Sequence, residues 1–139
     1  MWGRKHRNLA VALTCADWRL HQRKVDLNRR LANLLGVHGV DLIAVPGPDG
    51  LVLPERSAEW KAAVAQIKLL IGAHSPLALA VVAHQRCAGH PVTDAAHGTD
   101  VLATAKALKA EAGFRGPVRA IVAVYHSDTA WDLKQAGEF

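Results

Sequence analysis

The chain has 139 residues, of which 50% are hydrophobic and 21% are charged, and these values favour one soluble globular domain over 1–139. The net charge of +5 suits a small anionic substrate or product. Because no binding motif accompanies the basic residues, a nucleic-acid partner is disfavoured. Two cysteines are too few for a disulfide framework, and the longest purely apolar run, Leu77 to Ala83, is too short to span a membrane. We therefore expect a cytoplasmic protein without a membrane partner.

Apolar runs and turn residues divide the first half of the chain into a strand, a helix and a second strand. Leu9 to Leu13 is a continuous apolar run, which is typical of a strand buried on both faces. A leucine stripe predicts a helix from about Val25 to Leu35, ended by Gly36. Asp41 to Val45 predicts the second strand, and the breaker-rich loop from Pro46 to Gly50 closes it.

The second half of the chain repeats this alternation. Ser57 is expected to be the N-cap of a helix that continues to about Ile71. The run from Leu77 to Ala83 predicts a third strand, which ends directly at His84. The remaining pattern predicts a helix from about Thr99 to Ala112, a strand from Val118 to Tyr125, and a short helix around Trp131.

Strands that alternate with helices predict an α/β fold, because right-handed crossover helices connect parallel strands. We expect one domain with a central, mainly parallel four-stranded sheet in the order 2-1-3-4, flanked by helices. Sites in such sheets form at the carboxyl ends of the strands, where the strand order reverses. This order would bring Cys15 next to the turn from His84 to Cys87.

The candidate site residues lie in two motifs, each directly after a predicted strand. Cys15, Asp17 and Arg19 form a C-x-D-x-R pattern, and His84 and Cys87 form H-x-x-C. Two thiolates and one imidazole suit zinc, with a fourth position left for water or a carboxylate. The alternative is two small buried cysteines and a loop histidine. We favour the metal because both motifs occur together and follow strands.

The two motifs resemble those of the β-class carbonic anhydrases, and the order of predicted elements is similar over most of the chain. The resemblance implies zinc held by Cys15, His84 and Cys87. In that family a metal-bound hydroxide attacks carbon dioxide and gives bicarbonate. Asp17 would orient the hydroxide, and Arg19 would hold the Asp17 carboxylate away from the metal. In some members the carboxylate binds zinc instead, which would make Asp17 a metal ligand in a closed form.

The sequence departs from the family pattern in several ways, one of which is that its first predicted strand begins by residue 9, where the family often has N-terminal helices that embrace the partner subunit. Trp18 stands where the family usually has a small residue, so it lines or obstructs the pocket, or else is a core or dimer-interface aromatic. The loop from Pro46 to Gly50 replaces the family's Arg-Asn-Ala-Gly-Asn stretch. Ala88 separates Cys87 from Gly89, whereas the family has glycine directly after this cysteine.

These observations predict reversible, zinc-dependent hydration of carbon dioxide to bicarbonate. One alternative is a zinc hydrolase of carbonyl sulfide or carbon disulfide, which a larger and drier pocket around Trp18 would favour. Another is a non-catalytic zinc-stabilised binding module with Asp17 as its fourth ligand. His90, His97 and His126 are expected to be surface or turn residues, with proton transfer as the alternative. Exposed sheet edges and the family resemblance predict a homodimer or higher homo-oligomer.

Overall fold

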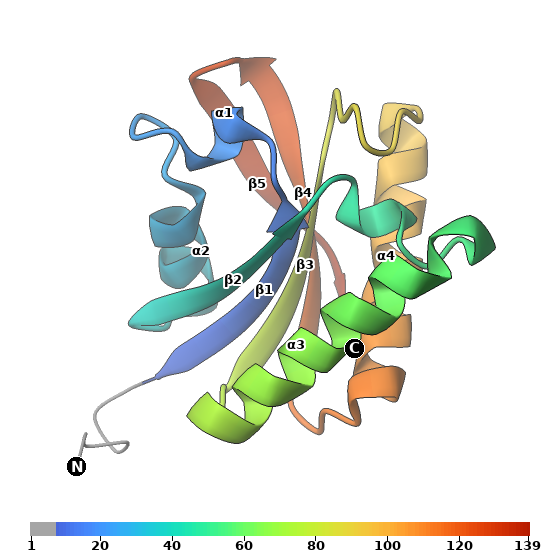
Figure 1. The fold of residues 1–139 in the computed structure, drawn as a ribbon. Coiled ribbons are helices and arrows are strands. Elements are labelled where there is room, and N and C mark those ends of the chain that lie inside the picture. The colour runs from blue at the N-terminus through green and yellow to red at the C-terminus, as the bar shows by residue number, and fades with distance from the viewer. Residues whose placement is uncertain (1–7) are drawn as a thin grey trace.

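The computed structural model describes residues 8–139 as a single α/β domain built around a five-stranded sheet (Figure 1). The strand order is β2-β1-β3-β4-β5. The first four strands run parallel to one another, and β5 pairs antiparallel with β4. The strands are β1 (Leu9–Cys15), β2 (Gly39–Val45), β3 (Ala78–His84), β4 (Val118–Ser127) and β5 (Ala130–Glu138).

The predicted order of the first four strands is confirmed, but the predicted number of strands is wrong and the sheet is mixed. The short helix expected around Trp131 is instead strand β5. Along the strand, Trp131 is buried, Asp132 is exposed, Leu133 is partly buried and Lys134 is exposed. This alternation has the period of a strand with one covered face, and pairing with β4 outweighs any local helical tendency.

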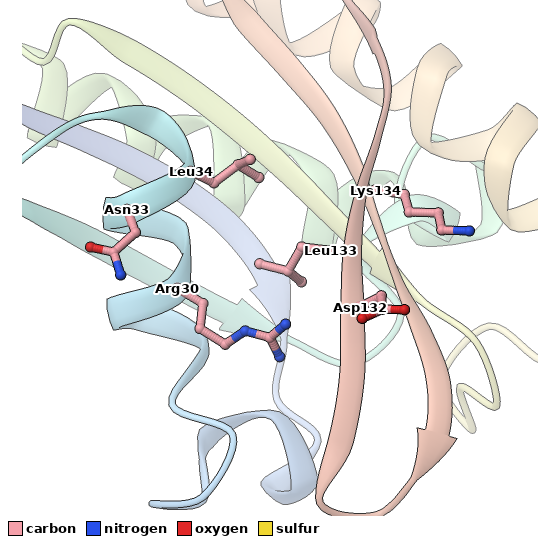
Figure 2. A pocket seen from close by; sticks show the side chains of 6 residues that line it. All are labelled: Arg30, Asn33, Leu34, Asp132, Leu133 and Lys134. Carbon is pink, nitrogen blue, oxygen red and sulfur yellow. The ribbon is translucent and has the colours of Figure 1, made fainter.

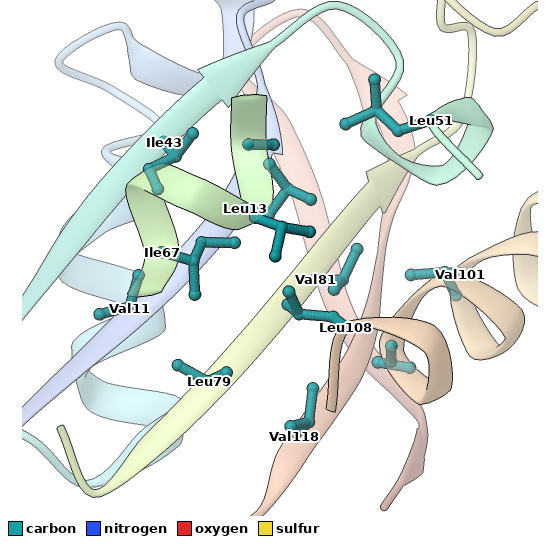
Figure 3. Packing of buried hydrophobic residues seen from close by; sticks show 14 of the residues in the cluster. Val11, Leu13, Ile43, Leu51, Ile67, Leu79, Val81, Val101, Leu108 and Val118 are labelled. Carbon is teal, nitrogen blue, oxygen red and sulfur yellow. The ribbon is translucent and has the colours of Figure 1, made fainter. Parts of the chain in front are cut away.

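Helices cover both faces of the sheet and make three layers (Figure 1). The helices α1 (Trp18–His21) and α2 (Leu27–Leu35) pack on one face, and α3 (Ser57–His74) and α4 (Asp94–Ala112) pack on the other. Figure 3 shows the core beneath α3 and α4, where Leu13, Ile67 and Leu108 are fully or almost fully buried. Two short 3-10 turns, η2 (Pro48–Gly50) and η3 (Pro54–Arg56), lie between β2 and α3.

Two helix starts differ from those predicted. Ser57 is the first residue of α3 and not its N-cap, because the chain enters the helix directly from η3. Helix α4 begins at Asp94, five positions before Thr99, because the Thr93 hydroxyl accepts a hydrogen bond of 3.2 Å from the Ala96 amide. The earlier start places His97 inside the helix.

Two loops at the carboxyl edge of the sheet touch through their glycines. A Cβ atom at Gly47, where φ is +54°, would lie 2.5 Å from the carbonyl carbon of Gly89. A Cβ atom at Gly89 would lie 2.6 Å from the Gly47 nitrogen. The loop after β2 and the loop after β3 can therefore pack backbone against backbone only with glycine at both positions.

A groove of about 540 Å³ separates α2 from β5 (Figure 2). Arg30 and Leu34 line it from the helix, and Asp132, Leu133 and Lys134 line it from the strand. Within residues 8–139 no helix has both the length and the apolar character needed to cross a membrane.

Candidate metal centre

Cys15, His84 and Cys87 lie together at the carboxyl edge of the sheet. Their potential ligand atoms are within 4.8 Å of one another. Cys15 is the last residue of β1 and His84 the last of β3, and these strands are neighbours, so the sheet itself brings the two motifs together. All three side chains are buried, at 4%, 0% and 4% exposure in chain order. The predicted adjacency of the two strand ends is therefore present.

The imidazole of His84 offers a nitrogen to this group. Its Nδ1 donates a hydrogen bond of 2.7 Å to the carbonyl oxygen of Gln85, which leaves Nε2 as the atom with a free lone pair. Nε2 is buried and has no hydrogen-bond partner among residues 8–139. A buried nitrogen without a partner is costly, and a backbone carbonyl on the other ring nitrogen is how metal-binding histidines are commonly oriented.

The two cysteines are free thiols whose Sγ atoms are 3.8 Å apart. Hydrogen bonding from Cys87 lowers the pKa of Cys15 to about 4, and the same contact raises the pKa of Cys87. Backbone amides favour the thiolate form of both cysteines: the amide of Gly47 lowers the pKa of Cys15, and those of His90 and Gly89 lower the pKa of Cys87, against the larger effect of Cys15. The pair therefore holds one thiolate that is ready to bind a cation, and binding would release the second proton.

The charge of this thiolate extends to the neighbouring histidine. Burial lowers the pKa of His84, but the adjacent Cys15 sulfur and its negative charge act the other way and leave the pKa raised overall. A cation bound at His84 Nε2 would meet the same favourable charge. The donor set of two sulfurs and one imidazole nitrogen, buried together, fits zinc.

Asp17 and Arg19 form a close ion pair beside the three candidate ligands. The Arg19 Nη2 atom lies 2.7 Å from Asp17 Oδ2, and Arg19 Nε lies 3.1 Å from Asp17 Oδ1. The backbone amide of Arg19 also donates to Oδ1 at 2.9 Å. These hydrogen bonds hold the pKa of Asp17 below its usual range. Asp17 Oδ2 is also 3.9 Å from His84 Nε2, so the carboxylate borders the unpartnered nitrogen.

Arg19 is held in place by the turn after β3 and by the hairpin of β4 and β5. Its Nη2 atom donates to the carbonyl oxygen of Arg86 at 3.0 Å, and its Nη1 atom lies 3.5 Å from Asp128 Oδ1. The guanidinium lies 5.4 Å from the ring of Trp131 and 5.7 Å from the ring of Tyr125. Asp128 and Trp131 were not predicted as part of the site, because the tail was expected to form a helix.

The ring of Trp131 connects the same hairpin to His84. The two rings meet edge to face with centroids 5.7 Å apart, and Trp131 is 3% exposed. The alternation of Trp131 and Leu133 with polar residues was the sequence signal that could have indicated a strand here.

Two other predictions for residues near the site need correction. Trp18 is 67% exposed, so the core alternative for it is wrong. His97 is 0% exposed and lies within α4, so it is neither a surface nor a turn residue. His90 lies in the turn after Cys87, as one of the two expected placements, although it is only 8% exposed. His126 is exposed as expected and pairs with Asp132 at 2.7 Å.

A three-layer α/β domain with two thiols and an imidazole at its carboxyl edge is a candidate metal-binding domain. The comparison with protein families identifies it further. A family model described as "Putative carbonic anhydrase" matches residues 5–136. The match covers nearly the whole chain, and the chain belongs to this family. Among curated proteins, none matches the chain.

Proposed function

We propose that this protein is a zinc enzyme of the β-class carbonic anhydrase type, which converts carbon dioxide and water reversibly to bicarbonate and a proton. The observation that carries the proposal is the Nε2 atom of His84, which has no hydrogen-bond partner within residues 8–139 and lies beside two free thiols. Family membership supports the reaction, and the buried donor set supports the metal.

The spacing of the sulfur atoms supports zinc as the metal. Two thiolates at about 2.3 Å from one ion, at a tetrahedral angle, would be about 3.8 Å apart. Cys15 Sγ and Cys87 Sγ are 3.8 Å apart. A disulfide would need about 2.0 Å, so the pair has the separation of metal ligands. Zinc, when bound, would act as a Lewis acid that lowers the pKa of a bound water toward neutrality.

The role we assign to Asp17 is to accept a hydrogen bond from the attacking water and to orient its lone pair toward carbon dioxide. A carboxylate can do this only while it remains ionised and fixed, and Arg19 provides both conditions. Arg19 also keeps the carboxylate away from the ligand position beside His84. This arrangement favours the catalytic proposal over the non-catalytic module, in which Asp17 would itself be the fourth ligand.

Two further parts of the proposal rest on simpler observations. Both thiols are free, which suits a reducing compartment such as the cytoplasm. The sheet ends in β2 on one side and β5 on the other, and a second copy of the chain would cover such an edge. We therefore propose a homodimer or a higher homo-oligomer.

The experiment that tests the function combines metal analysis with stopped-flow kinetics on one sample. We expect about one zinc per chain and hydration of carbon dioxide that increases with pH through the neutral range. Carbonyl sulfide and carbon disulfide should be tested in parallel, because turnover of these alone would favour the hydrolase alternative. Zinc without any turnover at alkaline pH would favour the non-catalytic module.

A further inference from the structure

A second group of potential ligands lies outside the candidate metal centre. It consists of Asp49, His90 and Asp100, whose potential ligand atoms are within 4.8 Å of one another. We call it the second-site group. Asp49 belongs to η2, His90 to the loop after Cys87, and Asp100 to α4. Three segments that are distant in sequence thus supply one side chain each.

The group is buried on one side and open on the other. Asp49 is 1% exposed and His90 is 8% exposed. The Asp100 side chain is 35% exposed, and its Oδ2 atom lies 2.7 Å from His90 Nε2. The neighbours Leu51 and Val101 pack in the core beneath α3 and α4 (Figure 3). Solvent therefore reaches the group past Asp100, while the core closes it from below.

Only one of the two carboxylate oxygens of Asp49 has a hydrogen-bond partner among the described residues. Oδ2 accepts a hydrogen bond of 2.7 Å from His97 Nδ1. Oδ1 is buried and has no hydrogen-bond partner within residues 8–139. A buried carboxylate oxygen without a donor or a cation is costly. The Thr104 hydroxyl lies between the backbones of two members of the group, 2.8 Å from the carbonyl oxygen of Asp100 and 3.1 Å from that of Asp49.

Arg56 does not donate a hydrogen bond to Asp49 Oδ1. Glu59, and to a smaller extent the charge of Asp49, raise the pKa of Arg56. The Arg56 guanidinium nevertheless donates to the carbonyl oxygens of Gly47 and Pro46, at 2.8 and 2.6 Å, and to Glu59. Two carboxylates and an imidazole therefore face one another, and one carboxylate oxygen still lacks a donor.

We propose that the second-site group binds a divalent cation through Asp49 Oδ1, His90 Nε2 and Asp100. Two carboxylates and one imidazole are hard and borderline donors, which suit Mn²⁺, Fe²⁺ or Co²⁺. The ion would take the place of the proton between His90 and Asp100. His97 would orient the Asp49 carboxylate from behind, as hydrogen-bond donors commonly orient ligating carboxylates. This donor set contains no sulfur, so it differs in metal preference from the cysteine centre.

The position of His90 connects the two sites. Its backbone amide donates to the Cys87 sulfur, and its ring packs against η2. A Cβ atom at Gly50 would lie 2.6 Å from His90 Nδ1, so this packing needs glycine at position 50. A cation in the second site would fix the loop that carries Cys87. The inference does not depend on which reaction the protein catalyses.

The test is a titration of the zinc-loaded protein with Mn²⁺, followed by electron paramagnetic resonance and by metal analysis. We expect one Mn²⁺ bound per chain with the zinc retained, and a melting temperature that increases with Mn²⁺ concentration. Asp100→Asn should weaken Mn²⁺ binding by at least about tenfold and leave the zinc in place. Asp100 is partly exposed and the substitution is isosteric, so we expect this variant to fold.

Asp94→Asn is the matched control, since it removes an exposed carboxylate from the same helix. It should bind Mn²⁺ as the unmodified protein does. Equal Mn²⁺ binding by both variants would overturn the proposal, as would an unmodified protein that binds no Mn²⁺ and shows no change in melting temperature. If Asp100→Asn does not fold, the same titration of Asp49→Asn decides between these results.

Discussion

Replacing Arg19 with alanine tests whether the Asp17–Arg19 pair keeps the site open. The substitution removes the side-chain donors on Nε and Nη2 and leaves Asp17 only the backbone amide of residue 19. Hydrogen bonds to charged groups contribute about 1.5–3 kcal/mol each. Because the two side chains are 17% and 15% exposed, water compensates part of this, and we take the total as about 2–3 kcal/mol.

That free energy corresponds to a factor of about 30 to 150. If Arg19 restrains the carboxylate from the metal, Arg19→Ala should lower kcat/KM for carbon dioxide hydration by about this factor near neutral pH. The zinc content should stay near one per chain. Hydroxide competes better with a carboxylate as the pH increases, so the deficit should become smaller toward alkaline pH.

Two further variants make the result interpretable. Arg19→Lys keeps the positive charge but lacks the planar fork that binds both carboxylate oxygens, so it should fall between the alanine variant and the unmodified protein. Arg23→Ala removes an exposed charge near the same helix and should leave the kinetics unchanged. Full activity of Arg19→Ala at every pH would refute the reasoning, because Asp17 would then need no restraint.

Three other experiments test the metal, the acid response and the assembly. Cys87→Ala should lose zinc. At free zinc near 100 times Kd, this loss should cost about 3 kcal/mol of unfolding free energy and lower the melting temperature by about 10 °C. A metal-free protein as stable as the zinc-loaded one would contradict this. Asp17→Asn should destabilise the metal-free protein. Arg19 lowers the folded-state pKa of Asp17. The difference in unfolding free energy between the two proteins should therefore reach its full size above about pH 5, and it should disappear as the pH falls through that lowered pKa. An equal difference between their urea melts at pH 7 and at pH 3 would rule this out. Sedimentation at micromolar concentration should give a dimer, and a monomer alone would count against edge pairing.

The parts of the fold that the sequence predicted are those set by local pattern. β1 and β3 are buried along almost their whole length, so each appears in the sequence as an uninterrupted apolar run. The strand ends could then be located, and with them Cys15 and His84. Strand β5 was missed because only one of its faces is covered, and its alternation extends over few residues around Trp131.

The second-site group could not have been predicted in the same way. Asp49 lies in a loop that contains two prolines and two glycines between Pro46 and Gly50, and nothing in that loop indicates burial of a carboxylate. The contact with His90 depends on the close approach of Gly47 and Gly89, which is a tertiary event. The sequence indicates burial of His97 only once α4 is known to begin before this residue.

The β4–β5 hairpin has a consequence for the order in which the site can assemble during synthesis. Cys15 and Cys87 are separated by 72 positions, and Arg19 and Asp128 by 109. A ribosome therefore completes the candidate ligand set well before it makes the residues that support Arg19 and cover His84. Until the hairpin is made, Arg19 lacks its contacts with Asp128 and Trp131, so the restraint on Asp17 is incomplete. Closing of the hairpin, and not metal capture, would then be the event that makes the centre competent.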